Sequence, residues 1–342
     1  MKNWLKNKIA RSYELLGKIS RQRQALVNTV VVLTYHGVIP SDMIYNGRHL
    51  FEYRNVVTTE EFDRQMAHLK KYYTPISVND FQNLPGQNTD KPYVVVTFDD
   101  GFENNYLYAF PILKKHGITG HFFLTTNFMG SRKFLWTEEV TYRVLHARSS
   151  ALTLHINGES IQISLSSEKR REAASIALRK QLKLQSRRVI EEALEELRKA
   201  TPELNSVELP RARYQFMSWE QAREMHREGM VLGSHTMDHF LLNNLNEQEV
   251  RETLSRSKQQ LEMELKAPCT VFSYPNGERE NFSQRDEKIL DELGFRYAFT
   301  QIPGFNPVHA LTNKKFDIYR INISHFMTGP VFHAVIAGLW KY

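Results

Sequence analysis

Short apolar runs alternate with amphipathic segments along most of this chain. The apolar, β-branched runs that predict strands are residues 29–37, 93–98, 120–126, 230–235, 269–275, 297–301 and 318–324. The segments with apolar residues at helical spacing are 58–73, 106–117, 218–229, 246–266 and 284–294. This alternation predicts an α/β fold around a parallel sheet, open or closed into a barrel. Because the strands are apolar along their whole length, the sheet is expected to be buried on both faces.

Residues 131–213 interrupt this alternation and have a different character. Asn157 and Gly158 separate two runs of alternating polarity, which is a strong signal for a β-hairpin. Residues 167–200 follow as one long charged helical segment, with an expected break near Lys183. We therefore expect an inserted hairpin-plus-helix subdomain that either caps a substrate site or decorates the surface.

The chain thus divides into three parts. Residues 29–130 and 214–342 form the α/β core, 131–213 are the insertion, and 1–28 form a basic N-terminal segment. The whole chain has a formal net charge of +7. Seven Lys and Arg residues against Glu14 alone give the N-terminal segment +6 of this charge, so the rest of the chain is nearly neutral.

Apolar residues of the N-terminal segment fall on one side of a predicted helix. Leu5, Ile9, Leu16 and Ile19 share this face, with Trp4 beside them. The pattern is typical of a basic amphipathic helix at an anionic membrane surface, and it also fits a solvated helix packed on the core. A nucleic-acid partner is not expected, because the remaining chain carries no basic stripe interleaved with aromatic residues.

The composition limits the chemistry. With 342 residues, 41% hydrophobic and 24% charged, the chain is globular and can bury a substantial core. Cys269 is its single cysteine, so any metal site must use histidines and carboxylates. No apolar run approaches the roughly 18 residues of a membrane span, and TVVVLTY lies too deep for a secretory leader. The sequence therefore predicts a cytoplasmic protein, or one peripheral to the inner face of the membrane.

Unusual polar residues follow the predicted strands. Asp99 and Asp100 end one strand, His36 ends another, and His235 and His239 follow a third. In parallel α/β folds such strand ends meet at one edge of the sheet, so these side chains are expected to converge. Two adjacent carboxylates repel each other unless a cation or solvent stabilises them. An ordinary Asp-Asp-Gly turn and hydrogen-bonded structural histidines remain alternative interpretations.

Two neutral imidazoles and one carboxylate make a three-ligand divalent metal site with an open position, as catalytic sites have. Zinc suits this ligand set, and cobalt, nickel and iron accept it as well. If Asp100 binds the metal, Asp99 can stay ionised beside the cation and act as a base.

Two of these motifs resemble those of a known family. TFDDG (97–101) and HTMDH (235–239) are similar to the first two motifs of the polysaccharide deacetylases of carbohydrate esterase family 4, the NodB-homology domain. FSYPNG (272–277) is similar to a variant of the third, and the resemblance covers about residues 29–325 without the insertion. It implies a distorted (β/α)7 barrel. It also implies metal-dependent removal of N-acetyl groups from hexosamine residues of a polysaccharide or oligosaccharide.

Carried over position by position, the resemblance implies a role for each motif residue. Asp99 would be the general base, and Asp100, His235 and His239 the metal ligands. The main-chain N–H of Asn276, which follows the proline of the third motif, would donate to the oxyanion.

The chain also departs from the family pattern. Ser273 stands where the third motif usually has an arginine that tethers the base, and Arg320 is the candidate substitute, with a structural surface arginine as the alternative. The stretch LTYHGV resembles the opening strand of the circularly permuted poly-N-acetylglucosamine deacetylases, which supplies their general acid. This resemblance assigns the acid to His36, with His325 in reserve.

The resulting hypothesis is a metal-dependent polysaccharide N-deacetylase acting on an N-acetylated glycan. One alternative is a deacetylase or deformylase for a lipid-linked sugar at the membrane, which the basic N-terminal segment would suit. Another is a glycan-binding module with little turnover, if the base has lost its tether.

Overall fold

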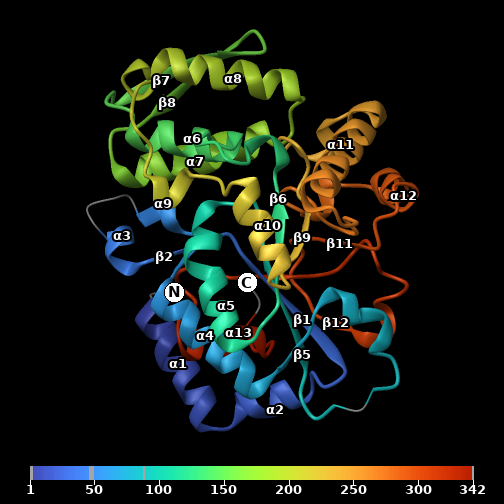
Figure 1. Cartoon of the computed structure of the whole chain (residues 1–342). Helices are drawn as coiled ribbons and strands as arrows, with labels where there is room; N and C mark the ends of the chain where they lie inside the picture. Colours follow the sequence, from blue (N-terminus) through green and yellow to red (C-terminus); the bar gives the residue numbers. More distant parts are fainter. Residues whose placement is uncertain (1–2, 46–49, 88, 341–342) are drawn as a thin grey trace.

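A curled, mostly parallel sheet forms the centre of the computed structural model, which describes residues 3–45, 50–87 and 89–340 (Figure 1). The strands are arranged in the order β11-β10-β9-β6-β5-β1-β12, with β13 paired to β1 and β4 to β5. Their bounds are β1 Thr29–Tyr35, β4 Thr74–Pro75, β5 Tyr93–Phe98, β6 Gly120–Leu124, β9 Val231–Ser234, β10 Val271–Ser273, β11 Tyr297–Phe299, β12 Asn306–Pro307 and β13 Ile321–Asn322. All of these pairs are parallel except β1 with β12, so the predicted parallel sheet is confirmed.

One segment near the C-terminus links β11, at one end of this sheet, to β1 near the other end. Ile318 forms a parallel bridge to Phe299 of β11, and Ile321 pairs with Leu33 of β1. Because the segment changes partner from β11 to β1 within a few residues, only β13 is a regular strand, and the predicted strand 318–324 is shorter than expected.

Side chains from the two faces of the sheet belong to two separate hydrophobic clusters. The cluster enclosed by the curled sheet includes Val30, Val32, Val95, Phe123, Phe299 and Ile318. The cluster beneath the covering helices includes Val31, Leu33, Val94, Val96 and Phe122. Alternate residues of β1 and β5 therefore point to opposite faces, as the pleat of a strand requires, and both faces are buried as predicted.

Helices follow most strands. Their bounds are α3 Ser41–Tyr45, α4 Thr59–Tyr72, α5 Phe110–His116, α6 Trp136–His146, α9 Arg211–Tyr214, α10 Trp219–Arg227, α11 Glu247–Leu265, α12 Gln284–Glu292 and α13 Pro330–Ile336. The predicted helix 106–117 begins as a π-helical turn, Asn105–Ala109, before α5. Side-chain caps start several helices: the Thr58 side chain accepts from the Glu61 N–H at the start of α4, and Asn246 caps α11. The short strands β2 Gly37–Ile39 and β3 Val56–Thr58 form a separate parallel pair.

The inserted region lies at the top of the molecule in Figure 1. Its hairpin joins β7 Ala151–Ile156 to β8 Glu159–Ser164 through Asn157 and Gly158, whose φ angles of 51° and 79° suit a tight hairpin turn. The charged segment after it forms α7 Glu168–Leu182 and α8 Arg187–Ala200, so the break expected near Lys183 is present.

The N-terminal segment forms two helices, α1 Asn3–Leu15 and α2 Lys18–Gln24, at the lower left in Figure 1. Gly17, with φ 66°, separates them, so helical periodicity does not run through the whole segment. As a result the predicted apolar face is only partly correct: Ile19 is buried, but Leu5 and Leu16 are exposed.

Within the described residues, the helices are all too short or too polar to cross a lipid bilayer.

Candidate metal-binding active site

Asp99 and Asp100 follow β5 directly and are both buried, with exposed fractions of 1% and 5%. Asp99 continues the inward-facing series of Val95 and Thr97, so its carboxylate points into the space that the sheet encloses. Asp100 has φ 76°, a left-handed conformation that Asp tolerates better than most residues. This turn directs the two neighbouring carboxylates to different partners.

Asp100 meets the two histidines of the HTMDH motif. Its Oδ1 lies 3.6 Å from Nε2 of His235 and 3.4 Å from Nε2 of His239. One ligand atom from each of the three residues lies within 4.8 Å of the others. His239 and Thr236 have positive φ angles, so the loop after β9 folds back tightly enough to place both imidazoles on one side.

Hydrogen bonding and burial prepare this cluster for a cation. Nδ1 of His235 donates to the Ser273 carbonyl at 2.8 Å, which leaves the Nε2 lone pair facing Asp100. Burial lowers the pKa of His235, and burial, with His235 nearby, lowers the pKa of His239 well below its usual value. Burial and the adjacent Asp99 raise the pKa of Asp100 well above its usual value. Two neutral imidazoles beside a destabilised carboxylate fit one divalent cation, which would offset the cost of ionising Asp100.

Asp99 is held by Arg320, and both side chains are almost completely buried. Nη1 donates to Oδ1 at 2.9 Å and Nη2 to Oδ2 at 2.7 Å, the two-pronged geometry of strong arginine–carboxylate pairs. Arg320 also donates to the carbonyl of Thr300 at 2.6 Å and to Oγ of Ser273 at 2.8 Å. Burial alone would raise the pKa of Asp99, but the charge and hydrogen bonds of Arg320 outweigh it and hold this pKa well below its usual range. Asp99 is therefore ionised.

Besides Arg320, Asp99 has two further hydrogen-bond donors: Oγ of Ser273, at 3.3 Å from Oδ2, and Gln301, which was missed in the sequence. Gln301 donates from Nε2 to Oδ2 of Asp99 at 3.1 Å. Because a carboxylate only accepts hydrogen bonds, this contact orients the Gln301 amide, and its Oε1 is left buried without a partner among the described residues. Its position at the end of a predicted strand was the signal that could have identified it.

His36 lies at the same rim, directly after β1, and is partly exposed. Burial lowers the pKa of His36 to about 4, although the nearby Asp99 opposes this shift. Its Nδ1 is buried and makes no hydrogen bond within the described residues. His325 lies against another segment: its Nδ1 pairs with the Arg54 carbonyl at 3.2 Å, and its ring contacts Phe326.

Asn276 and Gly277 form a left-handed turn after β10, with φ angles of 58° and 59°. A Cβ at Gly277 would lie 2.7 Å from the Gln301 nitrogen, so only glycine fits there without a shift of the main chain. Among the described residues, the main-chain N–H of Asn276 has no hydrogen-bond acceptor, and its side-chain Nδ2 is buried without one. This turn therefore presents free donors beside the Asp99 group.

The inserted region also reaches the site. Nε1 of Trp136 donates to the His239 carbonyl at 3.2 Å, and the indole is buried, so it packs the insertion against the barrel. Glu138, which the sequence did not single out, pairs with Arg213 at 2.7 Å. Its charge contributes to raising the pKa of both His36 and Asp100, so this buried pair belongs to the electrostatic surroundings of the site.

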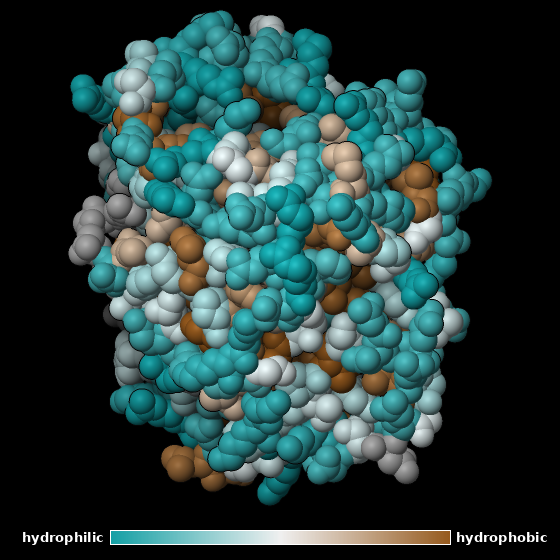
Figure 2. Space-filling model, in the orientation of Figure 1, coloured by the Kyte–Doolittle hydropathy of each residue, from teal (hydrophilic) through white to brown (hydrophobic). Residues whose placement is uncertain are grey.

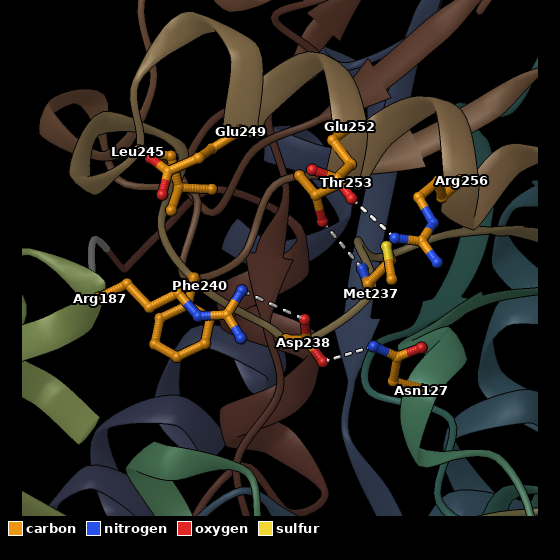
Figure 3. A pocket seen from close by; sticks show the side chains of 10 residues that line it. All are labelled: Asn127, Arg187, Met237, Asp238, Phe240, Leu245, Glu249, Glu252, Thr253 and Arg256. Atoms are coloured by element: carbon orange, nitrogen blue, oxygen red, sulfur yellow. Dashed lines mark hydrogen bonds and ion pairs between the residues drawn. The ribbon is translucent and has the colours of Figure 1, made fainter.

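A pocket of about 370 Å³ lies between the insertion and the HTMDH loop (Figure 3). Arg187 of α8 reaches across it, stacking over the Phe240 ring at 4.8 Å and approaching Asp238 at 3.7 Å. Asn127 donates to the other carboxylate oxygen of Asp238 at 2.7 Å. Asp238, which lies between the two histidines in sequence, is thus engaged outside the cluster.

Comparison with known proteins agrees with this geometry. The sequence model of the family described as polysaccharide deacetylase matches residues 86–298, which include both the TFDDG and HTMDH motifs. This chain belongs to the polysaccharide deacetylase family, as its motifs predicted. His36 and Arg320 lie outside the matched range.

Individual relatives are distant. YxkH of Bacillus subtilis, named as a polysaccharide deacetylase, is 21% identical over 246 residues, which are 72% of this chain and 57% of YxkH. The chain therefore spans little more than half of that relative.

Similar solved structures share the fold. IcaB from Ammonifex degensii has a TM-score of 0.56 and 21% identity, covering 91% of this chain and 97% of IcaB. The Streptococcus pyogenes deacetylase PplD, solved with acetate, has a TM-score of 0.56 and 17% identity, covering 90% and 98%. The predicted distorted barrel of the NodB-homology type is confirmed.

Proposed function

We propose that this protein is a metal-dependent hydrolase that removes N-acetyl groups from hexosamine residues of a glycan. The observation that carries the proposal is the pairing of two carboxylates with two different partners: Asp99 with buried Arg320, and Asp100 with His235 and His239. The first arrangement keeps a base ionised, and the second offers three ligands to a divalent ion. Family membership makes deacetylation the reaction class.

Asp100, His235 and His239 would hold the metal. This ligand set suits zinc, and it also accepts cobalt, nickel or iron. When bound, the metal supplies Lewis-acid polarisation of the acetamide carbonyl and lowers the pKa of water.

Asp99 accepts the proton of the water that attacks the acetamide carbon. Arg320 keeps that carboxylate ionised and fixes its orientation through two hydrogen bonds. The free main-chain N–H of Asn276 donates to the negative charge that develops on the carbonyl oxygen. The carbon–nitrogen bond then breaks, acetate forms, and the sugar nitrogen needs a proton to leave as an amine.

His36 is the candidate donor of this proton. Its imidazole is neutral at rest, because burial lowers its pKa to about 4, so it must gain a proton during turnover before it can give one. His36 lies near Asp99, which takes up a proton in the attack step, and this supports a role in which His36 gains a proton and then donates it to the amine.

The alternative of a glycan-binding module assumed that the base had lost its arginine partner. Arg320 pairs with Asp99, which argues against that alternative. The proposed substrate is an N-acetylated glycan. Lipid-linked acetylated sugars are tested as a second substrate beside free oligomers.

The deciding experiment measures acetate release from N-acetylglucosamine oligomers by metal-stripped protein, with zinc or cobalt added back. We expect activity only with metal. We expect Asp99→Asn to lower kcat by about 10³-fold, because a general base contributes roughly 10²–10⁴-fold.

Asp238→Asn is the matched control, since Asp238 belongs to the same loop but faces Asn127 and Arg187. It should stay within about twofold of the parent in kcat. Metal-loaded protein that releases acetate neither from free oligomers nor from lipid-linked sugars would refute the proposal.

A further inference from the structure

Helix α1 and the turn after it present large apolar residues to solvent. Trp4, Leu5, Leu15 and Leu16 have exposed fractions of 56%, 38%, 88% and 61%. Figure 2 shows a hydrophobic patch at the lower edge of the molecule, over the turn between α1 and α2. Exposed apolar groups gathered on one surface element mark an interaction site more often than isolated ones do.

The opposite side of α1 is already occupied. Ala10 is fully buried, the Tyr13 ring lies 6.4 Å from that of Trp340, and Glu14 accepts from Nδ1 of His333 in α13 at 2.8 Å. The helix therefore packs on the barrel by one face, and its exposed apolar residues lie on the opposite face, away from the core.

Basic residues are interleaved with the exposed apolar ones. Trp4, Lys8, Arg11 and Leu15 occupy positions i, i+4, i+7 and i+11, which share one face of a helix. Nζ of Lys8 lies 4.7 Å from the Trp4 ring centre. Lys8 and Arg11 are exposed and, among the described residues, make no ion pair with a carboxylate.

Two more exposed cations, Lys18 and Arg21, continue this surface onto α2. The one acidic residue of the segment, Glu14, is engaged by His333. The surface formed by α1 and the start of α2 is therefore both apolar and strongly cationic.

We propose that this surface docks the protein on an anionic phospholipid bilayer. Apolar side chains enter the boundary between headgroups and acyl chains, while neighbouring lysines and arginines bind lipid phosphates. A second copy of the chain fits less well, because a two-fold contact through this face would set Lys8 and Arg11 against their own counterparts. This docking does not depend on the deacetylase reaction. Because α1 and the insertion lie at opposite ends of the molecule, a bilayer bound at α1 would not cover the insertion (Figure 1).

The test is sedimentation of the full chain with vesicles of phosphatidylcholine, with and without phosphatidylglycerol. We expect binding to the anionic vesicles only, weakened by high salt, which screens surface charges. Leu15→Ser combined with Leu16→Ser should reduce the affinity about tenfold or more. Lys8→Glu combined with Arg11→Glu should reduce it by roughly 25-fold, since each cation near the surface contributes about a factor of five.

Matched controls come from the inserted region, which carries equally exposed residues. Leu184, with an exposed fraction of 75%, gives Leu184→Ser, and the exposed Lys169 and Lys180 give a double charge reversal. These variants should bind vesicles like the parent. Circular dichroism of every variant checks that the helices are retained.

Tryptophan emission gives an independent readout of the same contact. Trp4 should move to an apolar setting on binding, so a blue shift should appear with anionic vesicles and be lost in Trp4→Phe. Equal vesicle binding by the α1 variants and the controls would overturn the proposal. So would a concentration-dependent dimer, seen by sedimentation velocity, that the α1 variants abolish.

Discussion

The rim of the barrel and the inserted region both carry many charges, but they hold them differently. At the rim, Asp99 and Arg320 are almost fully buried and share two hydrogen bonds. In the insertion, Arg187 pairs with Glu191 and Asp238 while nearly half exposed. Water screens the second kind of pair and not the first, so similar contacts should differ greatly in their effect on stability and activity.

The largest loss of stability should come from Arg320→Met, because this substitution leaves the Asp99 carboxylate buried without its cation. We expect a loss of about 3–5 kcal/mol in the free energy of unfolding, measured by urea denaturation. The double variant Asp99→Asn with Arg320→Met buries no unpaired charge, so it should be more stable than Arg320→Met alone. If Arg320→Met unfolds at the parent's urea concentration, the pair does not stabilise the rim.

Within the rim, the two candidate acids can be separated. His36→Ala should lower kcat for acetate release by about 10²-fold, as loss of a general acid does, with little change in KM. His325→Ala is the matched control and should remain within about twofold, because its ring pairs with the Arg54 carbonyl. A larger loss in His325→Ala than in His36→Ala would reverse the assignment.

Metal binding should stabilise the rim and not the insertion. Zinc at about 100 times its dissociation constant should raise the free energy of unfolding by about 2.7 kcal/mol, since it binds the folded cluster. His239→Ala removes one of the three ligands and should abolish most of this gain. A gain of equal size in His239→Ala would place the zinc elsewhere.

The smallest effect is expected for the exposed ion pairs of Arg187 in the inserted region. Arg187→Gln removes the partner of Glu191 and Asp238, and it should change the free energy of unfolding by no more than about 0.5 kcal/mol. Thermal or urea unfolding measures this directly. A cost as large as that of Arg320→Met would show that the bridge between α8 and the HTMDH loop is a structural part of the rim.

Much of the fold could be predicted because it depends on local pattern. The alternation of apolar runs and amphipathic helices indicated a parallel sheet, and the strand at 93–98 was predicted with the bounds of β5. Asn157 and Gly158 located the hairpin turn. Boundaries were less accurate near the C-terminus, where the segment around Arg320 exchanges one partner strand for another.

The face of α1 shows where a local pattern is insufficient. Helical spacing grouped Leu5, Ile9, Leu16 and Ile19, yet α1 ends at Leu15, so that Leu16 lies in the turn with Gly17 and Ile19 lies on α2. Packing of α1 against α13 and Trp340 makes the side with Ala10 and Tyr13 its inner face. Since spacing alone does not say which side a neighbour will cover, the exposed apolar residues became visible only in the structure.

What the sequence by itself determined is the set of groups that end the strands: the carboxylate pair after β5 and the two histidines after β9. Their spacing is local, and chain direction in a parallel sheet brings such ends to one rim. The sequence offered Arg320 only as a candidate partner of Asp99, and the tertiary structure decided between that role and a surface arginine. Arg320 is 221 positions away along the chain, and it reaches the carboxylate because its segment links β11 to β1 across the sheet. Such a contact depends on barrel closure, and no local pattern encodes it.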